Sequence, residues 1–151
     1  MAYEYGKSNW RFDWTFFAIC ALAASVFLVG VDRAPVPTVD GAVRASEART
    51  IVETGTWFPI YYQGAEVHDH PPLFVWITAL SFKIFGINDF AANFPSRIFA
   101  ALTLLFTGLI AIEIGFSRGV ALLSVLVLAA TRDFVLSNVR GYIEPLLSFF
   151  F

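Results

Sequence analysis

The feature that most constrains this chain is a run of 18 residues without a charged side chain, from Trp14 to Val31. A helix rises by about 1.5 Å per residue, so the run nearly crosses the roughly 30 Å hydrocarbon core of a membrane. Lys7 and Arg11 precede it as in a signal peptide, but the apolar core of such a peptide is usually about 7 to 15 residues long. We therefore expect residues 14–31 to form a first transmembrane helix that is not cleaved.

The composition of the whole chain agrees with a membrane protein. Of its 151 residues 58% are hydrophobic and 15% are charged, and the mean hydropathy is +0.68, which exceeds the apolar character of an ordinary soluble domain. The formal net charge of -2 provides no basic surface for nucleic acid, so we expect no such partner. The one cysteine, Cys20, cannot form an internal disulfide and is expected to be a small apolar residue of the first helix.

Residues 32–89 differ in character from the first apolar run. Between Asp32 and Pro72 there are six acids, three arginines, both histidines and five prolines, and no apolar run long enough to span a membrane. We expect this segment to be a loop on the water side of the membrane that carries short interfacial helices. Its aromatic residues, such as Trp57 and Tyr61, are of the kind that gathers at the membrane-water interface.

Residues 41–54 of this loop have the pattern of an amphipathic helix. Ala48 and Ile51 are expected on its apolar side, and Glu47 is expected away from it. Asp40 stands at the N-cap position, where a carboxylate accepts hydrogen bonds from the free N–H groups of the first turn. Capping alone is a sufficient structural reason for an aspartate at this position.

Further apolar segments follow the loop and predict an all-α integral membrane protein. Residues 73–85 are too short to span comfortably and are expected to lie along the interface, with Lys83 extending its ammonium group toward water. We expect a second transmembrane helix at residues 90–116 and a third at residues 119–139. Residues 143–151 are expected to begin a fourth helix, which would be truncated within the membrane.

Counting the crossings predicts the topology. With the N-terminus in the cytoplasm, the loop of residues 32–89 lies outside it, the short turn at Arg118 lies inside, and the chain returns outside near Arg140 and Glu144. The inner turn carries a base and no acid, which agrees with the positive-inside rule. We therefore expect a multi-pass protein of the plasma or inner membrane with its ionisable loop, including Asp40, on the extracytoplasmic side.

Two short patterns in the sequence are candidates for chemistry. His68 and His70 flank Asp69, so on an extended segment both imidazoles point to one side. A His-x-His metal site and a solvated loop shaped by its prolines are both consistent with this pattern, and the second is the more common. Arg140 and Glu144 are spaced i, i+4, so on a helix they share a face, either as a functional pair or as a stabilising one.

Several motifs occur in a specific order through residues 39–151. They are Asp40 with Arg44 and Arg49 on a short helix, Gly55-Thr56-Trp57, Asp69-His70-Pro71-Pro72-Leu73, Trp76, Phe85-Gly86 and Phe94-Pro95-Ser96-Arg97. This order resembles the N-terminal part of the polyprenyl-phosphate-sugar-dependent glycosyltransferases, which include the protein O-mannosyltransferases and the aminoarabinose transferases of lipid A. The resemblance implies a GT-C fold with many transmembrane helices, of which these residues would be the N-terminal portion.

The resemblance also implies catalytic roles for two acids. Asp40 matches the acidic residue of the first extracytoplasmic loop that is implicated in catalysis and is a candidate for deprotonating the acceptor hydroxyl. Glu144 matches a second acidic position, at the start of the fourth helix, where the family usually has aspartate before proline. Glutamate keeps the charge and lengthens the side chain by one methylene group.

Other residues match positions that contact the donor in the family. His70 occupies a position where many members carry a lysine that contacts the lipid phosphate. The usual arginine position near the catalytic acid holds Val43 here, with Arg44 one step on, and Arg140 is a third cation that we assign to the phosphate. Asp69 matches a carboxylate that in some members helps to bind a metal, so the cofactor is left open, with a divalent metal as the candidate.

The residues and the resemblance together favour a membrane glycosyltransferase. Its partners would be membrane lipid, a polyprenyl-phosphate sugar donor and a lipid, glycan or protein acceptor whose hydroxyl receives the sugar outside the cytoplasm. The alternative is a non-catalytic protein, either a truncated relative or a small membrane scaffold subunit. A transporter is disfavoured because the ionisable groups cluster in a loop, and the charge-free helix centres offer no ion pathway.

Overall fold

The computed structural model describes residues 39–68, 71–139 and 143–150, together with Ser25. The predicted first helix at residues 14–31, with Cys20, lies outside these residues. The described elements are α2 (Val39–Thr54), β1 (Tyr61–Tyr62), β2 (Ala65–Glu66), α3 (Leu73–Phe85), α4 (Asp89–Glu113), α5 (Arg118–Ala130), α6 (Arg132–Val139) and α7 (Glu144–Phe150). The expectation of a mostly helical protein is confirmed.

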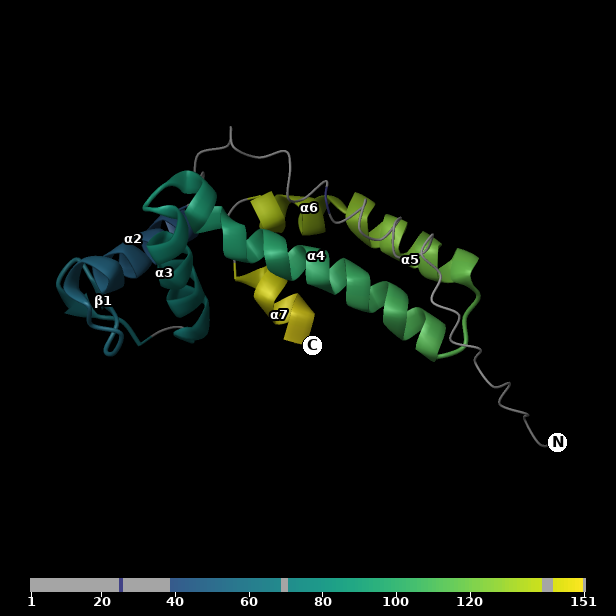
Figure 1. Cartoon of the computed structure of the whole chain (residues 1–151), viewed down its shortest axis with the longest axis horizontal. Coiled ribbons are helices and arrows are strands. Elements are labelled where there is room, and N and C mark those ends of the chain that lie inside the picture. Colours follow the sequence, from purple (N-terminus) through teal and green to yellow (C-terminus); the bar gives the residue numbers. More distant parts are fainter. Residues whose placement is uncertain (1–24, 26–38, 69–70, 140–142, 151) are drawn as a thin grey trace.

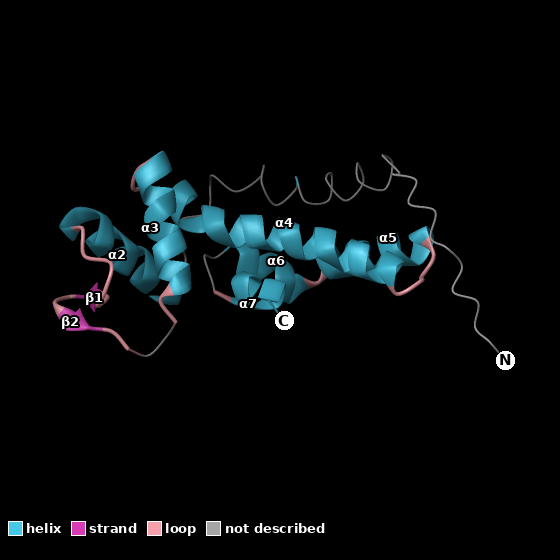
Figure 2. Cartoon of the chain, turned by 60° about the horizontal axis from the view of Figure 1, so that its bottom comes forward, coloured by secondary structure: helices cyan, strands magenta, loops and turns pink. Residues whose placement is uncertain are grey.

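The long helix α4 organises the other elements (Figure 1). At its N-terminal end lies a unit made of α2, the β1-β2 hairpin and α3, in which α2 packs on α3 and β1, and α3 packs on α4. Helices α5 and α6 return along α4 toward this unit, and α7 packs against α4 and α6. Figure 2 shows the hairpin at the end of the molecule farthest from α5.

Glycines and a tight turn shape the hairpin unit. The N–H of Gly55, at φ +76°, donates to the Ile51 carbonyl over 2.9 Å and ends α2. Gln63 and Gly64 both have positive φ, at +50° and +84°, and together form the two-residue loop between the strands. Two positive φ values are the mark of a type I′ turn, whose twist matches that of an antiparallel pair.

A hydrogen bond beside a proline of α4 joins α3 to α4. Pro95 has no N–H, so the carbonyl of Ala91, four residues earlier, loses its usual partner within the helix. The hydroxyl of Ser81, on α3, donates to that carbonyl over 2.7 Å. The start of α4 is capped by Asn88, whose side-chain oxygen accepts from the N–H of Ala91 over 2.8 Å. The helix junction is therefore held by hydrogen bonds at a place where the backbone ladder is broken.

Two apolar cores lie along the molecule. The first joins α2, the hairpin segment, α3 and the start of α4; its buried side chains include Ile51, Ile60, Val75 and Phe82. The second joins α4 to α5, with the partly buried residues of α6 packed against it, and its buried members are Leu104, Ala111, Ala121 and Val125. The two cores sit at different levels of α4, so this helix carries a different set of neighbours at each end.

Among the described helices, α4 is the one that is both long enough and apolar enough to cross a membrane, while α3 and α5 are apolar but shorter. It ends at Glu113, before residue 116, because Gly115 adopts φ +100° and the N–H of Phe116 donates back to the Ala111 carbonyl over 3.0 Å. This pattern is a Schellman C-cap.

The stretch 119–139, expected as one helix, forms two. Thr131 has extended backbone angles, φ -66° and ψ 121°, and separates α5 from α6. Its hydroxyl donates to the Val127 carbonyl over 2.9 Å, satisfying one of the last carbonyls of α5. Arg132 and Asp133 follow directly and begin α6 as exposed residues. The charged pair therefore lies at a helix boundary and not in the interior of one apolar span.

Candidate functional site

The candidate site begins on one face of α2. Asp40, Arg44, Glu47 and Ile51 are separated by four, three and four residues, so they lie above one another along the helix. Their burial rises along this line: Asp40 is exposed, Arg44 is half-buried, Glu47 is 0% exposed and Ile51 is 1% exposed. The face thus runs from solvent into the first core within three turns.

Asp40 lies inside the first turn of α2 and is not the N-cap residue that the sequence suggested, because the helix begins at Val39. A carboxylate in the first turn is stabilised by the positive end of the helix dipole. Its side chain is exposed, so the carboxylate is accessible to a hydroxyl group from solvent. This geometry is compatible with a general base.

Glu47 corrects the sequence interpretation of α2. We expected it away from the apolar side, but it is fully buried beside Ala48 and in line with Ile51. The reason is the period of the helix: residues four apart are only about 40° apart around the axis. Glu47 also has an interaction partner, which is what a carboxylate needs in order to remain buried.

Arg44 is the unusual residue of this face. Its Nε atom is buried and has no hydrogen-bond partner in the part of the chain that the structure describes. Its neighbours on the helix face, Asp40 and Glu47, form no ion pair with it among the described residues. By contrast, Arg49 on the same helix is exposed and pairs with Glu53 over 2.6 Å. A half-buried guanidinium that forms no ion pair with the described residues is suited to bind an anion of a ligand.

The β hairpin holds a second carboxylate. Glu66 accepts a hydrogen bond from the Tyr61 hydroxyl over 3.3 Å, and its other oxygen lies 3.3 Å from Nε2 of His68. His68 is 70% exposed at its side chain. The next two residues, Asp69 and His70, lie outside the described residues, so the His-x-His prediction is not tested. In the described part of the chain no three His, Cys, Asp or Glu side chains form a metal-binding group.

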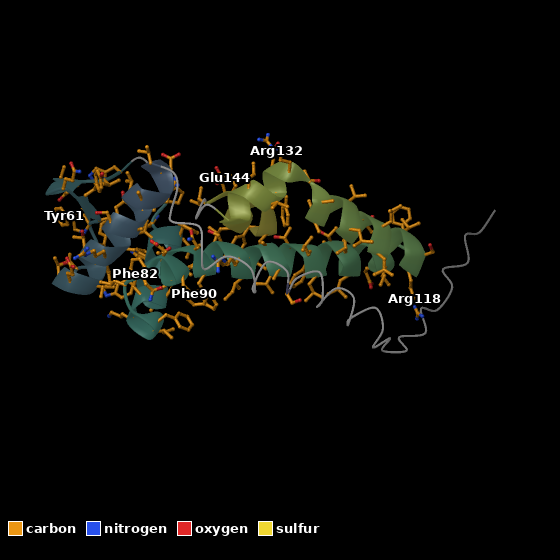
Figure 3. All side chains as sticks on the ribbon, turned by 90° about the horizontal axis from the view of Figure 1, so that it is seen from above. Tyr61, Phe82, Phe90, Arg118, Arg132 and Glu144 are labelled. Carbon is orange, nitrogen blue, oxygen red and sulfur yellow. The ribbon has the colours of Figure 1, made fainter. Side chains whose placement is uncertain are left out.

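Glu144 is the first residue of α7 and is exposed. Ring contacts hold α7 on α4: the Phe149 ring lies 5.5 Å from those of Phe99 and Phe106. Figure 3 shows Glu144 toward the end of α4 that carries α2 and α3, and Arg118 at the opposite end. Helix α2, which carries Asp40, packs on α3 at this same end of α4. Arg140, predicted to accompany Glu144, lies outside the described residues.

Sequence analysis missed a buried polar stripe on α4. Arg97, which the sequence analysis named only as part of a motif, is inside the helix and 1% exposed, as is Asn93, one turn earlier. The guanidinium of Arg97 lies 5.8 Å from the centre of the Phe90 ring and has further partners. Ser96 is also fully buried. The spacing of these residues at i, i+3 and i+4 was the signal that could have revealed one inward face.

Comparison with known proteins decides the family. The model of the dolichyl-phosphate-mannose-protein mannosyltransferase family matches residues 69–150, more than half of the chain. The chain belongs to this family. The match covers α3 to α7, and therefore Glu144 and the segment of Asp69 and His70, while α2 with Asp40 precedes it. The resemblance inferred from the motif order is confirmed.

Two relatives of this mannosyltransferase family member extend the comparison. A protein of Aquifex aeolicus described as uncharacterized is 33% identical over 107 residues, which is 71% of this chain and 21% of that protein. An undecaprenyl phosphate-alpha-4-amino-4-deoxy-L-arabinose arabinosyl transferase of Aeromonas hydrophila is 27% identical over 101 residues, 67% of this chain and 18% of that protein. The chain thus spans about a fifth of the length of these relatives. No solved structure matches it.

Proposed function

We propose that this chain is part of a membrane glycosyltransferase that moves a sugar from a polyprenyl-phosphate donor to a hydroxyl group of a lipid, glycan or protein. Family membership supports glycosyl transfer in a membrane. The observation that carries the more specific proposal is that exposed Asp40 and half-buried Arg44 lie one turn apart on the same face of α2. Asp40 is a base open to an acceptor, and Arg44 is a cation that forms no ion pair with the described residues.

The proposed reaction uses these two side chains in different ways. The acceptor oxygen bonds to the anomeric carbon of the sugar, and the bond from that carbon to the phosphate oxygen breaks. Asp40 receives the hydroxyl proton, and the departing phosphate keeps the bonding electron pair. Arg44 donates charge-assisted hydrogen bonds to the phosphate as its negative charge increases. Side chains spaced i, i+4 have Cβ atoms roughly 5 to 6 Å apart, a distance that one sugar can bridge.

Other residues complete the proposal. Glu144 is proposed as a second carboxylate at the acceptor, and His70 and Arg140 as further cations at the phosphate. Asp69 is the proposed ligand if a divalent metal takes part. The described residues alone form no metal-binding group, so no step of the reaction is assigned to a metal.

The proposed orientation places the α2–α3 end of α4 outside the cytoplasm and the Arg118 turn inside it. The position of Arg118 at the opposite end of α4 from Glu144 supports this arrangement (Figure 3). A basic turn on the cytoplasmic side follows the positive-inside rule. The base, the cation and Glu144 would then face the extracytoplasmic side together.

Removing the negative charge of Asp40 in the full-length protein tests the proposed general base. Asp40→Asn should lower sugar transfer in membrane vesicles by about 10²- to 10⁴-fold, because it removes a general base, while insertion is unchanged. Asp89→Asn, an exposed acid in the first turn of α4, is the matched control. Near-normal turnover by Asp40→Asn would exclude Asp40 as the base.

Binding of undecaprenyl phosphate to the purified protein tests the cation separately. Arg44→Gln should weaken binding by about 10- to 100-fold, the value of a charge-assisted hydrogen bond. Arg49→Gln, on the same helix but exposed and paired with Glu53, should bind like the wild type. Equal binding by all three proteins would contradict the role of Arg44, and no binding by any of them would favour a non-catalytic scaffold.

A further inference from the structure

An apolar groove lies between α3 and the first half of α4. Its walls include Ile77, Leu80 and Ile84 of α3, and Phe94, Ile98 and Phe99 of α4. Its volume is about 200 Å³, against about 30 Å³ for one water molecule in the liquid. The groove therefore has room for several carbon atoms of a chain, but not for a whole lipid.

The groove offers no polar group to an occupant. The one hydroxyl in its lining belongs to Ser81, and that hydroxyl already donates to the Ala91 carbonyl over 2.7 Å. The rest of the lining consists of aliphatic and aromatic side chains and Pro95. A sugar, phosphate or peptide backbone would lose hydrogen bonds to water here without replacement. Only hydrocarbon fits this lining without such a cost.

The groove opens onto an exposed apolar surface at the end of α3. Ile84 is 73% exposed, Leu80 49% and Phe85 42%. Lys83 lies beside this surface, with its ammonium group 4.9 Å from the centre of the Trp57 ring. Figure 2 shows α3 crossing the N-terminal end of α4, the helix that can span a membrane. An apolar stripe edged by lysine and tryptophan is typical of a helix lying at a membrane surface.

The groove lies on the opposite side of α3 from the candidate site. The side of α3 that joins the core with α2 carries Val75 and Ala79. Leu80 and Ile84 each follow one of these residues by five positions, which places them about 140° further round the helix. A hydrocarbon chain in the groove is thus separated by α3 itself from the α2 face that carries Arg44. This separation favours an ordinary membrane lipid over the tail of a donor whose phosphate sits at Arg44.

We propose that the groove binds one acyl chain of a bilayer phospholipid. The acyl chain enters beside α4 and fills the space between α3 and the Pro95 region. The lipid thereby holds α3 at the membrane surface. The presence of an acyl chain is inferred from the groove and its exposed rim, whereas the choice of a phospholipid over the donor's tail rests on the proposed position of the donor phosphate at Arg44. The bound lipid is a structural ligand rather than a substrate.

Photocrosslinking tests this proposal with the full-length protein in phosphatidylcholine nanodiscs. A trace of the phosphatidylcholine carries a diazirine in its acyl chain, and the crosslinked peptides are mapped by mass spectrometry. We expect crosslinks to the groove segments of α3 and α4. Ile98→Trp, which fills the groove, should reduce them at least fivefold. Ile110→Trp, on the same helix but 55% exposed and outside the groove, should leave them unchanged.

A second variant keeps the proposal testable if Ile98→Trp does not fold. Leu80→Asn places a polar group at the rim of the groove, at a half-exposed position, and should also reduce crosslinking. Equal crosslinking in the wild type and both groove variants would overturn the proposal. So would displacement of the crosslink by a low mole fraction of undecaprenyl phosphate, which would assign the groove to a polyprenyl tail. Lipid crosslinks found only on segments outside the groove would overturn it as well.

Discussion

The two ends of α4 are surrounded by different kinds of buried side chain. Around its N-terminal end the buried side chains include six polar or charged ones: Glu47, Thr78, Ser81, Asn93, Ser96 and Arg97. Around its C-terminal half the core with α5 is built from Leu104, Ala111, Ala121 and Val125. There the outward face of α5 exposes large apolar residues such as Leu123 and Val127. One region has polar groups inside, and the other has apolar groups inside and outside.

This difference shows in which region of the molecule polar groups are buried despite the free-energy cost of removing them from water. Removing polar groups from water is unfavourable unless each finds a partner, and ionisable groups within membrane segments usually serve a function. The α4–α5 region needs only close packing, which suits a surface facing lipid. The region of α2, α3 and the start of α4 needs specific partners, and the proposed chemistry belongs to this region.

The largest effect on the free energy of unfolding should come from removing the buried charge of Arg97 on α4. Arg97→Met leaves the partners of a fully buried guanidinium unmatched and should destabilise the protein by about 3 to 5 kcal/mol. The free energy of unfolding can be measured by denaturant titration in detergent micelles. Arg132→Met, at an exposed position in α6, should change it by less than about 0.5 kcal/mol. Similar values for the two variants would mean that the contrast between the two regions has no energetic basis.

An intermediate effect should come from the apolar core. Leu104 is 0% exposed, so Leu104→Ala removes packing and leaves a cavity, for an expected loss of about 2 to 3 kcal/mol. Leu123→Ala, at a 61% exposed position on α5, is the matched control and should cost far less in the same unfolding measurement. A large loss from Leu123→Ala would indicate that the outward face of α5 is covered by protein and does not face lipid.

The smallest of the three effects should come from the hydrogen bond between α3 and α4. Ser81→Ala leaves the Ala91 carbonyl without its donor and should cost about 1 to 2 kcal/mol. Ser124→Ala removes a hydroxyl that bonds within its own helix, to the Val120 carbonyl over 2.9 Å, and should be nearly neutral. The decisive double variant is Ser81→Ala with Pro95→Ala, because restoring the N–H at position 95 should recover part of the loss.

Much of the helical framework could be predicted from local patterns. The apolar segments anticipated α3 and α4, and Gly55 and Gly86 mark the ends of α2 and α3, as left-handed positions do. The motif order identified the family before any comparison. The candidate site is anticipated less completely. Asp40 and Arg44 were proposed from their matches and spacing and stay predictions, whereas the buried stripe of Asn93 and Arg97 was not anticipated.

The sequence alone determined that this is an apolar, helical chain with an ionisable loop and the motif order of its family, because hydropathy, helix caps and spacing are local properties. Only the tertiary structure decided that Glu47 and Arg97 are buried, that Thr131 divides one expected span, and that Ser81 satisfies the carbonyl released by Pro95. The physical reason is that burial and hydrogen-bond partners depend on which helices pack together. Residues ten or more positions apart meet only through that packing.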